Sequence, residues 1–232
     1  MSNNDIFNWY ENPVVRRMLP QEQPYPFENT HIKVNSRILV VGQTGTGKTQ
    51  ALLHFIAKMP NTFRKIIIFH KEMETLYEFL KEHLQGAIEF HTKLSELPKL
   101  AKLREDYEDE DRILLVLDDW MLELKNYPNV NDYFIYGRKR GITVFCLAQD
   151  YYPIPKTLRN QMTYLILFKL GQQKDVNMII RQFDTKEKVL LNIYEDATRE
   201  PLNFLKIQTT ADCPLNEKFS KNFLGFYKIK DD

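Results

Sequence analysis

One eight-residue stretch constrains this chain more than any other feature of its sequence. Residues 42–49 read Gly-Gln-Thr-Gly-Thr-Gly-Lys-Thr, the pattern of a phosphate-binding loop (P-loop). In such a loop the backbone amides surround the phosphates, the lysine reaches the outer phosphates and the last hydroxyl can hold Mg²⁺. The loop needs a strand before it and a helix after it, because the positive end of the helix also faces the anion. The pattern therefore predicts an α/β fold that binds a nucleotide.

The segments on either side of the loop meet this requirement. Residues 37–41 form a short apolar run typical of a strand, and residues 50–58 have the apolar spacing of a helix that ends near Pro60. Lys48 is a candidate catalytic residue as well as a phosphate ligand, because its charge can stabilise the transferring phosphoryl group. We expect contacts to the nucleotide from Gly42, Gln43, Thr44, Gly45, Thr46, Gly47, Lys48, Thr49 and Gln50.

Composition narrows the class of protein. Of the 232 residues, 43% are hydrophobic, which is enough for one sizeable α/β core. The formal net charge is only +1, so a uniformly basic surface is excluded and any contact to DNA must come from local clusters. The two cysteines form no paired framework, and no apolar run approaches the roughly 20 residues of a membrane span. We therefore expect a soluble intracellular protein.

The order of segments predicts the fold. Apolar runs of strand type alternate with segments of helical spacing, which indicates a mostly parallel central sheet with helices on both faces. We expect strands at 37–41, 65–70, 87–91, 112–117, 142–147, 164–168 and 202–208, and helices at 50–58, 72–83, 95–103, 131–138, 173–183 and 186–194. Residues 1–33 are rich in proline and aromatic residues, and we expect an irregular arm that packs on its own domain or on a neighbouring subunit. The α/β domain then covers 34–210, and 211–232 form a weakly patterned tail.

A second motif ends in two carboxylates. Residues 113–117 form an apolar run that leads directly into Asp118 and Asp119. This is the form of a Walker B element, in which Asp118 would hold Mg²⁺ together with Thr49. Asp119 could orient or deprotonate the attacking water. The alternative is a solvated carboxylate pair that caps the next helix.

A complete strand, 65–70, lies between the P-loop strand and the acidic strand. That order is found in RecA-like motor ATPases, in which the strand after the acidic one lies next to the P-loop strand. We therefore interpret 34–210 as a RecA-like P-loop NTPase domain. Gln149, just beyond the strand at 142–147, is then placed to contact the γ-phosphate and the attacking water. The alternative for Gln149 is a glutamine in a surface loop.

Three arginines are candidates for the charge at the γ-phosphate. Arg138 and Arg140 precede the strand at 142–147, and Arg159 follows it. A cation at this position stabilises the transition state, and a neighbouring subunit commonly supplies it. We expect at least one of the three to act in trans as an arginine finger. For 138–140, a solvated turn and a contact to DNA phosphates remain as alternatives.

Together these residues resemble the poxvirus-type genome-packaging ATPases of the FtsK–HerA superfamily, whose relatives occur in large DNA viruses, virophages, Polinton-like elements and some membrane-containing viruses. The similarity covers about 37–170 and is most specific over 137–149 and the following run Asp-Tyr-Tyr-Pro-Ile-Pro-Lys-Thr-Leu-Arg-Asn. One departure is Asp118-Asp119, where many relatives have Asp-Glu.

The resemblance implies ATP and Mg²⁺ as cofactors and ATP hydrolysis as the reaction. It also implies a homo-oligomeric ring, a pentamer or a hexamer, that pumps double-stranded DNA into a preformed capsid. Capsid or portal vertex proteins would then be partners. The implied location is the host cytoplasm or a viral factory, or association with the virion.

Other P-loop functions are weaker alternatives. The extra strand before Asp118, and Gln149 beyond the next strand, argue against a small-molecule phosphotransferase. A GTPase switch needs Asn-Lys-x-Asp and Asp-x-x-Gly, and the sequence contains neither. The main alternative is a helicase or conjugative-type DNA pump of the same superfamily, which a preference for single- or double-stranded DNA would distinguish. Basic residues within 93–104 and 218–230 are undecided candidates for contacts to DNA.

Overall fold

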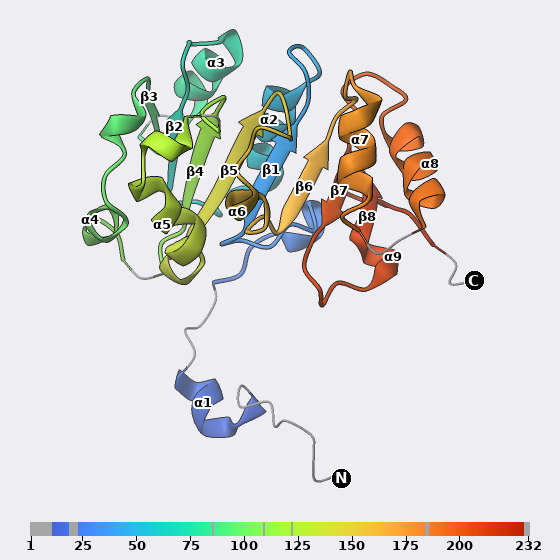
Figure 1. The fold of residues 1–232 in the computed structure, drawn as a ribbon. Helices are drawn as coiled ribbons and strands as arrows, with labels where there is room; N and C mark the ends of the chain where they lie inside the picture. The colour runs from blue at the N-terminus through green and yellow to red at the C-terminus, as the bar shows by residue number, and fades with distance from the viewer. Residues whose placement is uncertain are drawn as a thin grey trace.

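Nine strands contributed by the described residues form one sheet at the centre of the structure (Figure 1). The structure is a computed structural model that describes residues 11–18, 23–84, 86–108, 110–121, 123–183 and 186–229. The strands are β1 (Arg37–Val41), β2 (Lys65–Phe69), β3 (Ile88–His91), β4 (Ile113–Asp118), β5 (Ile142–Ala148), β6 (Tyr164–Leu167), β7 (Leu205–Gln208), β8 (Phe219–Lys221) and β9 (Gly225–Phe226). Their order in the sheet is β3-β2-β4-β5-β1-β6-β7-β8-β9.

The sheet is parallel from β3 to β6 and antiparallel from β7 onward. The predicted mostly parallel sheet is therefore confirmed, as is the position of β5 between β4 and the P-loop strand β1. All six residues of β4 and all seven of β5 are buried. Continuous apolar runs of this kind are expected when helices cover both faces of a parallel sheet.

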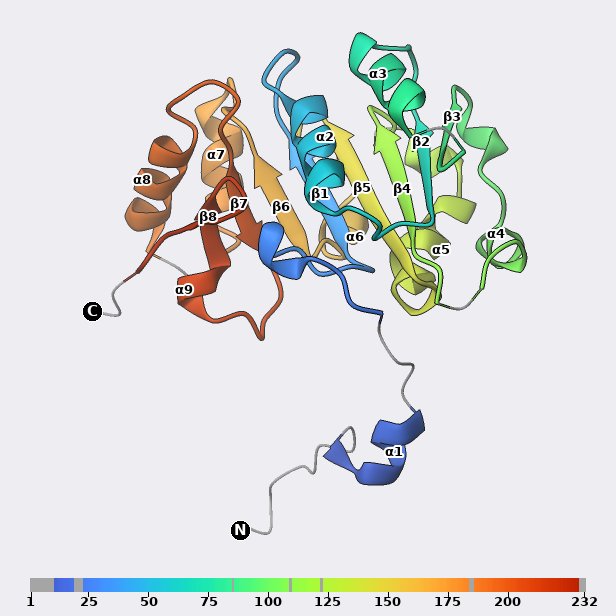
Figure 2. The same ribbon diagram turned by 180° about the vertical axis from the view of Figure 1, so that it is seen from behind.

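Helices cover the two faces unequally (Figures 1 and 2). Alternate residues of β1 point to opposite sides: Leu39 joins one core cluster and Val40 joins the other. The first cluster includes residues of α4 (Leu100–Glu105), α5 (Asn129–Tyr136), α6 (Lys156–Arg159), α7 (Gln173–Ile180) and α8 (Glu187–Ala197). The second includes residues of α2 (Lys48–Lys58) and α3 (Thr75–His83). None of the helices in the described part of the chain is long and apolar enough to cross a membrane.

Several predicted element boundaries are wrong for local reasons. The helix expected at 95–103 is split into a 3₁₀ turn, Leu94–Glu96, and α4, because Pro98 lacks the N–H that a continuous helix needs. The helix expected at 131–138 ends at Tyr136, and a 3₁₀ turn covers Gly137–Arg140. The strand expected from 202 begins at Leu205, because Leu202 has φ +65°, outside the range of a strand.

Described residues near both ends of the chain form regular elements. The arm contains a short helix, α1 (Pro13–Met18), without buried residues, and Figure 1 shows it outside the α/β body. Ile32, at the end of the arm, is buried in the second core cluster, so this part of the arm packs on its own domain. The segment expected to be a weakly patterned tail contains α9 (Leu215–Lys218) together with β8 and β9, which extend the sheet.

A buried lysine connects these two ends. Lys206 on β7 is 1% exposed, and its Nζ donates hydrogen bonds to the carbonyl oxygens of Thr30 (2.8 Å) and Phe223 (2.7 Å). The ammonium also lies 5.1 Å from the centre of the Phe226 ring. Burial lowers the pKa of Lys206 to about 7. This side chain therefore joins the arm and the β8–β9 hairpin through polar contacts inside the core.

Candidate functional site

The P-loop connects the end of β1 to the start of α2. Gly45 and Gly47 have φ values of +79° and +108°, a region that side chains other than glycine rarely adopt. A Cβ on Gly47 would also lie 2.8 Å from Cδ2 of Leu202. The Nζ of Lys48 donates to the carbonyl oxygens of Gly42 (2.9 Å) and Gln43 (3.2 Å), which places the ammonium across the loop.

The acidic pair and the candidate sensor lie at the same edge of the sheet as the P-loop. β4, β5 and β1 are adjacent and parallel, so their carboxyl ends meet there. The amide of Gly42 donates to the carbonyl oxygen of Ala148 at 3.1 Å, which connects the loop to the end of β5. The structure therefore brings together five of the residues selected from the sequence: Lys48, Thr49, Asp118, Asp119 and Gln149.

Asp118 is the buried member of the acidic pair. It is 9% exposed, and its Oδ2 accepts a hydrogen bond of 2.6 Å from the Tyr77 hydroxyl. Burial raises the pKa of Asp118 to about 6, against the opposing effect of the Tyr77 hydrogen bond. The carboxylates of Asp119 and Glu74 also raise that pKa, and the ammonium of Lys48 lowers it. Such a concentration of negative charge beside the P-loop suits a cation.

Asp119 is held in place by two contacts. Its φ of +57° is in the left-handed region, and its amide donates to the carbonyl oxygen of Leu147 at 3.1 Å. Its Oδ2 accepts a hydrogen bond of 2.9 Å from Nε2 of Gln149. Strained backbone conformations of this kind are concentrated at functional sites. Asp119 and Gln149 also line a pocket of about 280 Å³ that opens beside the ends of β4 and β5.

Three further residues at this edge were not selected from the sequence. The Thr49 hydroxyl donates to Oε2 of Glu74 at 3.3 Å, and Tyr77 donates to Asp118. Lys71 lines the same pocket as Asp119. All three follow β2, which pairs with β4. The sequence did offer one signal for these residues. They follow a predicted strand that lies next to the acidic strand in a parallel sheet, so they must lie near the same carboxyl edge as the acidic pair.

The oxygen atoms at this edge fit Mg²⁺. A hydroxyl and carboxylates are hard oxygen ligands, and Mg²⁺ is usually held by one or two carboxylates together with substrate phosphates and water. Thr49 and Asp118 are the residues that would hold it, with Glu74 hydrogen-bonded to Thr49. Among the described residues no group of three or more His, Cys, Asp or Glu side chains is arranged as a metal site. The geometry suits an ion that is shared with a nucleotide.

The three candidate arginines do not join this site within one chain. Arg138 and Arg140 are exposed in the turn just before β5, and therefore at the opposite, amino edge of the parallel strands. Arg159 ends α6, and its guanidinium lies 4.8 Å from the centre of the Tyr151 ring. Its Nε is buried and, within the described part of the chain, has no hydrogen-bond partner.

One undecided DNA-contact candidate has an internal role. Arg104 is 8% exposed and donates to the backbone carbonyl oxygens of Asp111 (2.9 Å) and Glu108. It therefore stabilises the loop that follows α4. A contact from Arg104 to DNA would require these bonds to break.

A P-loop at the end of a central parallel strand, with an acidic pair two strands away and a polar residue just beyond the strand between them, defines a P-loop NTPase. The chain belongs to the Poxvirus A32 protein family, which matches residues 26–203. The family predicted from the sequence is thus confirmed.

Relatives in poxviruses are distant. The chain is 24% identical over 201 residues to DNA packaging protein OPG160 of Monkeypox virus, a match that covers 82% of this chain and 63% of the relative. It is 23% identical to the protein of the same name in Vaccinia virus (strain Copenhagen), covering 82% and 70%. The chain thus spans only about two thirds of the length of these relatives.

Solved structures share the fold. B204, the DNA-packaging ATPase from Sulfolobus Turreted Icosahedral Virus, superimposes with a TM-score of 0.60 at 13% identity, over 82% of this chain and 98% of that protein. B204 from Sulfolobus turreted icosahedral virus 2 in complex with ATP-gammaS superimposes with a TM-score of 0.55 at 14% identity, over 82% of this chain and 98% of that protein. The cytoplasmic domain of the type VII secretion ATPase EccC from Thermomonospora curvata superimposes with a TM-score of 0.52 at 15% identity, over 85% of this chain and 26% of that protein. These similarities establish the α/β fold of P-loop ATPases.

Proposed function

We propose that this chain is the ATPase subunit of a motor that drives double-stranded DNA into a viral capsid. The observation that carries the proposal is the convergence of a P-loop, an acidic pair and a glutamine at one edge of the sheet, in a chain of the Poxvirus A32 family. The names of the relatives, which describe DNA packaging, supply the cargo.

Each residue at this edge has a distinct part in the proposed reaction. The amides of 42–49 bind the phosphates of ATP, and Lys48 stabilises the charge on the outer phosphate. A bound Mg²⁺, held by Thr49 and Asp118, would neutralise charge between the phosphates. Asp119 accepts the proton of the attacking water, and Gln149 holds that carboxylate at the end of the strand.

The arginine in this proposal comes from another copy of the chain, in a ring of five or six. Arg138 and Arg140 are exposed at the amino edge, whereas Arg159 is stacked on Tyr151. Replacing each in turn with alanine tests the role. Loss of turnover with unchanged ATP binding identifies the trans residue, and normal turnover in all three variants refutes an arginine finger from this set.

The main test is the steady-state rate of ATP hydrolysis with and without long double-stranded DNA. Asp119→Asn keeps the shape of the side chain but removes its basicity, so it is the catalytic blank. Asp132→Asn is the matched control, because it makes the same aspartate-to-asparagine exchange at an exposed position on α5. We expect duplex DNA to stimulate the native chain and the Asp132→Asn variant only. Stronger stimulation by single-stranded DNA would favour a helicase, and a rate indifferent to both would contradict the motor.

Coupling around the ring has its own test. Rings assembled from native and Lys48→Ala chains contain a known fraction of subunits that cannot bind ATP productively. If each site is completed by its neighbour, activity falls by more than the fraction of mutant chains. A loss strictly proportional to that fraction would show that the sites act independently.

A further inference from the structure

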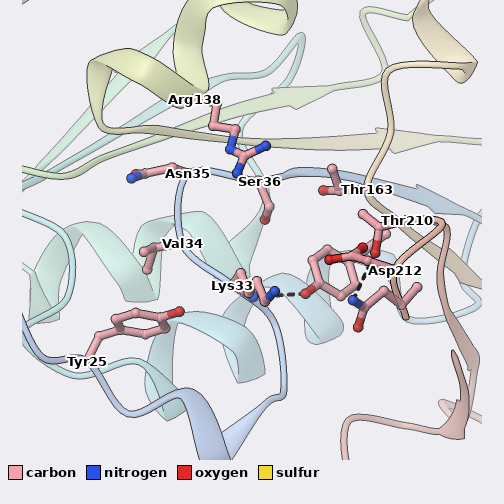
Figure 3. A pocket seen from close by; sticks show the side chains of 11 residues that line it. Tyr25, Lys33, Val34, Asn35, Ser36, Arg138, Thr163, Thr210 and Asp212 are labelled. Carbon is pink, nitrogen blue, oxygen red and sulfur yellow. Dashed lines mark hydrogen bonds between the residues drawn. The ribbon is translucent and has the colours of Figure 1, made fainter. Parts of the chain in front are cut away.

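A second pocket lies at the amino edge of the parallel strands, at the opposite end of β1 from the P-loop (Figure 3). Its volume is about 240 Å³, many times the roughly 15 Å³ that one buried water needs. The walls come from the segment before β1, the turn before β5, the start of β6 and the segment after β7. Neither the P-loop nor the acidic pair contributes to it.

Two buried polar atoms on the wall of this pocket have no hydrogen-bond partner among the described residues. Ser36 is 4% exposed, and Figure 3 shows its side chain pointing into the pocket. Within the described part of the chain, neither Oγ of Ser36 nor Oδ1 of Asn35 has a hydrogen-bond partner. Asn35 also has a left-handed φ of +56°. Its backbone N–H donates a hydrogen bond of 2.8 Å to the Thr143 hydroxyl, which holds the residue in this conformation. Buried polar groups are normally paired, so unpaired ones on the wall of a pocket point to a ligand.

Cations and further donors surround these atoms. Lys33 and Arg138 line the pocket, and Figure 3 shows the Arg138 guanidinium directed toward Ser36. Asp212 is the carboxylate of the lining. The Thr210 hydroxyl and the backbone amide hold its pKa below the usual range, with help from the charges of Lys33 and Arg138. The pocket thus offers two cationic side chains against one carboxylate that is already hydrogen-bonded.

The geometry points to a binding site for a phosphate ester at this edge of the sheet. Arg138 can bind two oxygen atoms of a phosphate at once, and Ser36 and Lys33 supply donors from another side. The Tyr164 hydroxyl accepts a bond of 3.1 Å from the amide of Lys33 and, as a phenol, can also donate. Donors that converge from several elements suit a tetrahedral oxyanion better than a planar carboxylate.

The remaining features explain why the ligand is an ester rather than free phosphate. The volume exceeds that of a phosphate group, so there is room for the sugar that carries it. Asn35 and Asp212 can accept hydrogen bonds from hydroxyl or amino groups of that carrier. The phosphate could belong to the backbone of DNA or to a free nucleotide, since the chemistry is the same. This inference does not depend on the proposed ATPase function.

Calorimetric titration of inorganic phosphate tests the site. The Lys48→Ala variant is the starting protein, because it weakens phosphate binding at the P-loop. We expect saturable binding that Arg138→Ala weakens by about tenfold or more and Ser36→Ala by a smaller factor. Lys139→Ala is the matched control: it removes the exposed cation next to Arg138 that does not line the pocket, and should change the affinity less than about twofold.

Competition identifies the carrier of the phosphate. Displacement by a short DNA duplex assigns the site to the DNA backbone, and displacement by AMP alone assigns it to a nucleotide. Failure of both to displace phosphate would overturn the assignment to an ester. Absence of saturable binding in Lys48→Ala, or equal losses in Arg138→Ala and Lys139→Ala, would overturn the site itself. The Ser36→Ala variant removes a single oxygen atom from the side chain. If its melting temperature equals that of the starting protein, the fold is kept and a loss of affinity reports on binding alone.

Discussion

The hydrogen bond from Tyr77 to Asp118 predicts how nucleotide turnover depends on pH. Asp118 has to be ionised to hold a cation, and its pKa of about 6 places that ionisation just below neutral pH. The Tyr77 hydroxyl, 2.6 Å from Oδ2, opposes the effect of burial by stabilising the charged carboxylate. Replacing Tyr77 with phenylalanine removes that stabilisation and leaves the ring in place.

The size of the effect follows from the strength of this bond. A hydrogen bond to a charged group contributes about 1.5–3 kcal/mol, and one pH unit corresponds to about 1.4 kcal/mol. The pKa of Asp118 should therefore rise in Tyr77→Phe, and the acid limb of kcat/KM for ATP should move up by about one to two pH units. At pH 7 the variant should keep about half of the native activity if the pKa rises by one unit and about a tenth if it rises by two, whereas above about pH 9 it should approach the native rate.

Tyr133→Phe is the matched control for this measurement. The Tyr133 hydroxyl is also in a buried side chain, but it donates to the carbonyl oxygen of Pro98 at 2.8 Å, away from the P-loop. It should lower the free energy of unfolding by about 1 kcal/mol and leave the acid limb unchanged. Titration of ATP itself is common to all three proteins and cancels in the comparison. Superimposable pH profiles for Tyr77→Phe and the native chain would refute the reasoning.

Three further changes test other parts of the structure. Gly47→Ala should abolish ATP binding and lower the free energy of unfolding by about 1–2 kcal/mol, because φ there is +108°; normal binding in a filter assay would contradict this. Mg²⁺ should increase the affinity for nucleotide about tenfold less in Glu74→Gln than in the native chain, because Glu74 positions the metal ligand Thr49. The affinity measured without Mg²⁺ should stay the same. Glu78→Gln, an exposed carboxylate on α3 just after Glu74, should change neither affinity, and an unaltered Mg²⁺ effect in Glu74→Gln would exclude its role. Burial lowers the pKa of Lys206 to about 7, whereas an exposed lysine has a pKa of 10.5. Between these two pH values the unfolded chain binds more protons than the folded chain, so the free energy of unfolding rises with pH across that window. Lys206→Met should remove this rise, at most about 1.4 kcal/mol per pH unit, in urea unfolding, whereas Lys228→Met, an exposed control, should keep it.

The core of the fold could be predicted because its strands are buried on both faces. β1, β4 and β5 are continuous apolar runs, and each ends in residues with recognisable chemistry: the P-loop, the acidic pair and Gln149. Parallel strands bring their carboxyl ends to one edge, so the pattern along the chain was sufficient to place these residues together.

Other parts depend on contacts that no local pattern records. β8 has three residues and β9 has two, so neither is long enough to show a period, and they form because they pair with β7 and with each other. Glu74 reaches Thr49 because α3, which follows Glu74, packs beside α2 on the same face of the sheet, and that packing is a property of the whole fold and not of the segment. The pocket at the amino edge combines four separate segments and has no signature of its own.

The direction of the strands also decides what the arginines can do. β5 has seven residues, and a strand of that length spans about 23 Å at about 3.3 Å per residue. Arg138 and Arg140 precede β5, and therefore lie a full strand length from the P-loop of their own chain, beyond the reach of a side chain. A catalytic guanidinium from this pair has to come from another copy, through a contact between the amino edge of one chain and the carboxyl edge of the next. Turnover per chain should then fall on dilution while ATP binding persists. A rate per chain that stays constant on dilution, together with inactive Arg138→Ala or Arg140→Ala variants, would contradict this geometry.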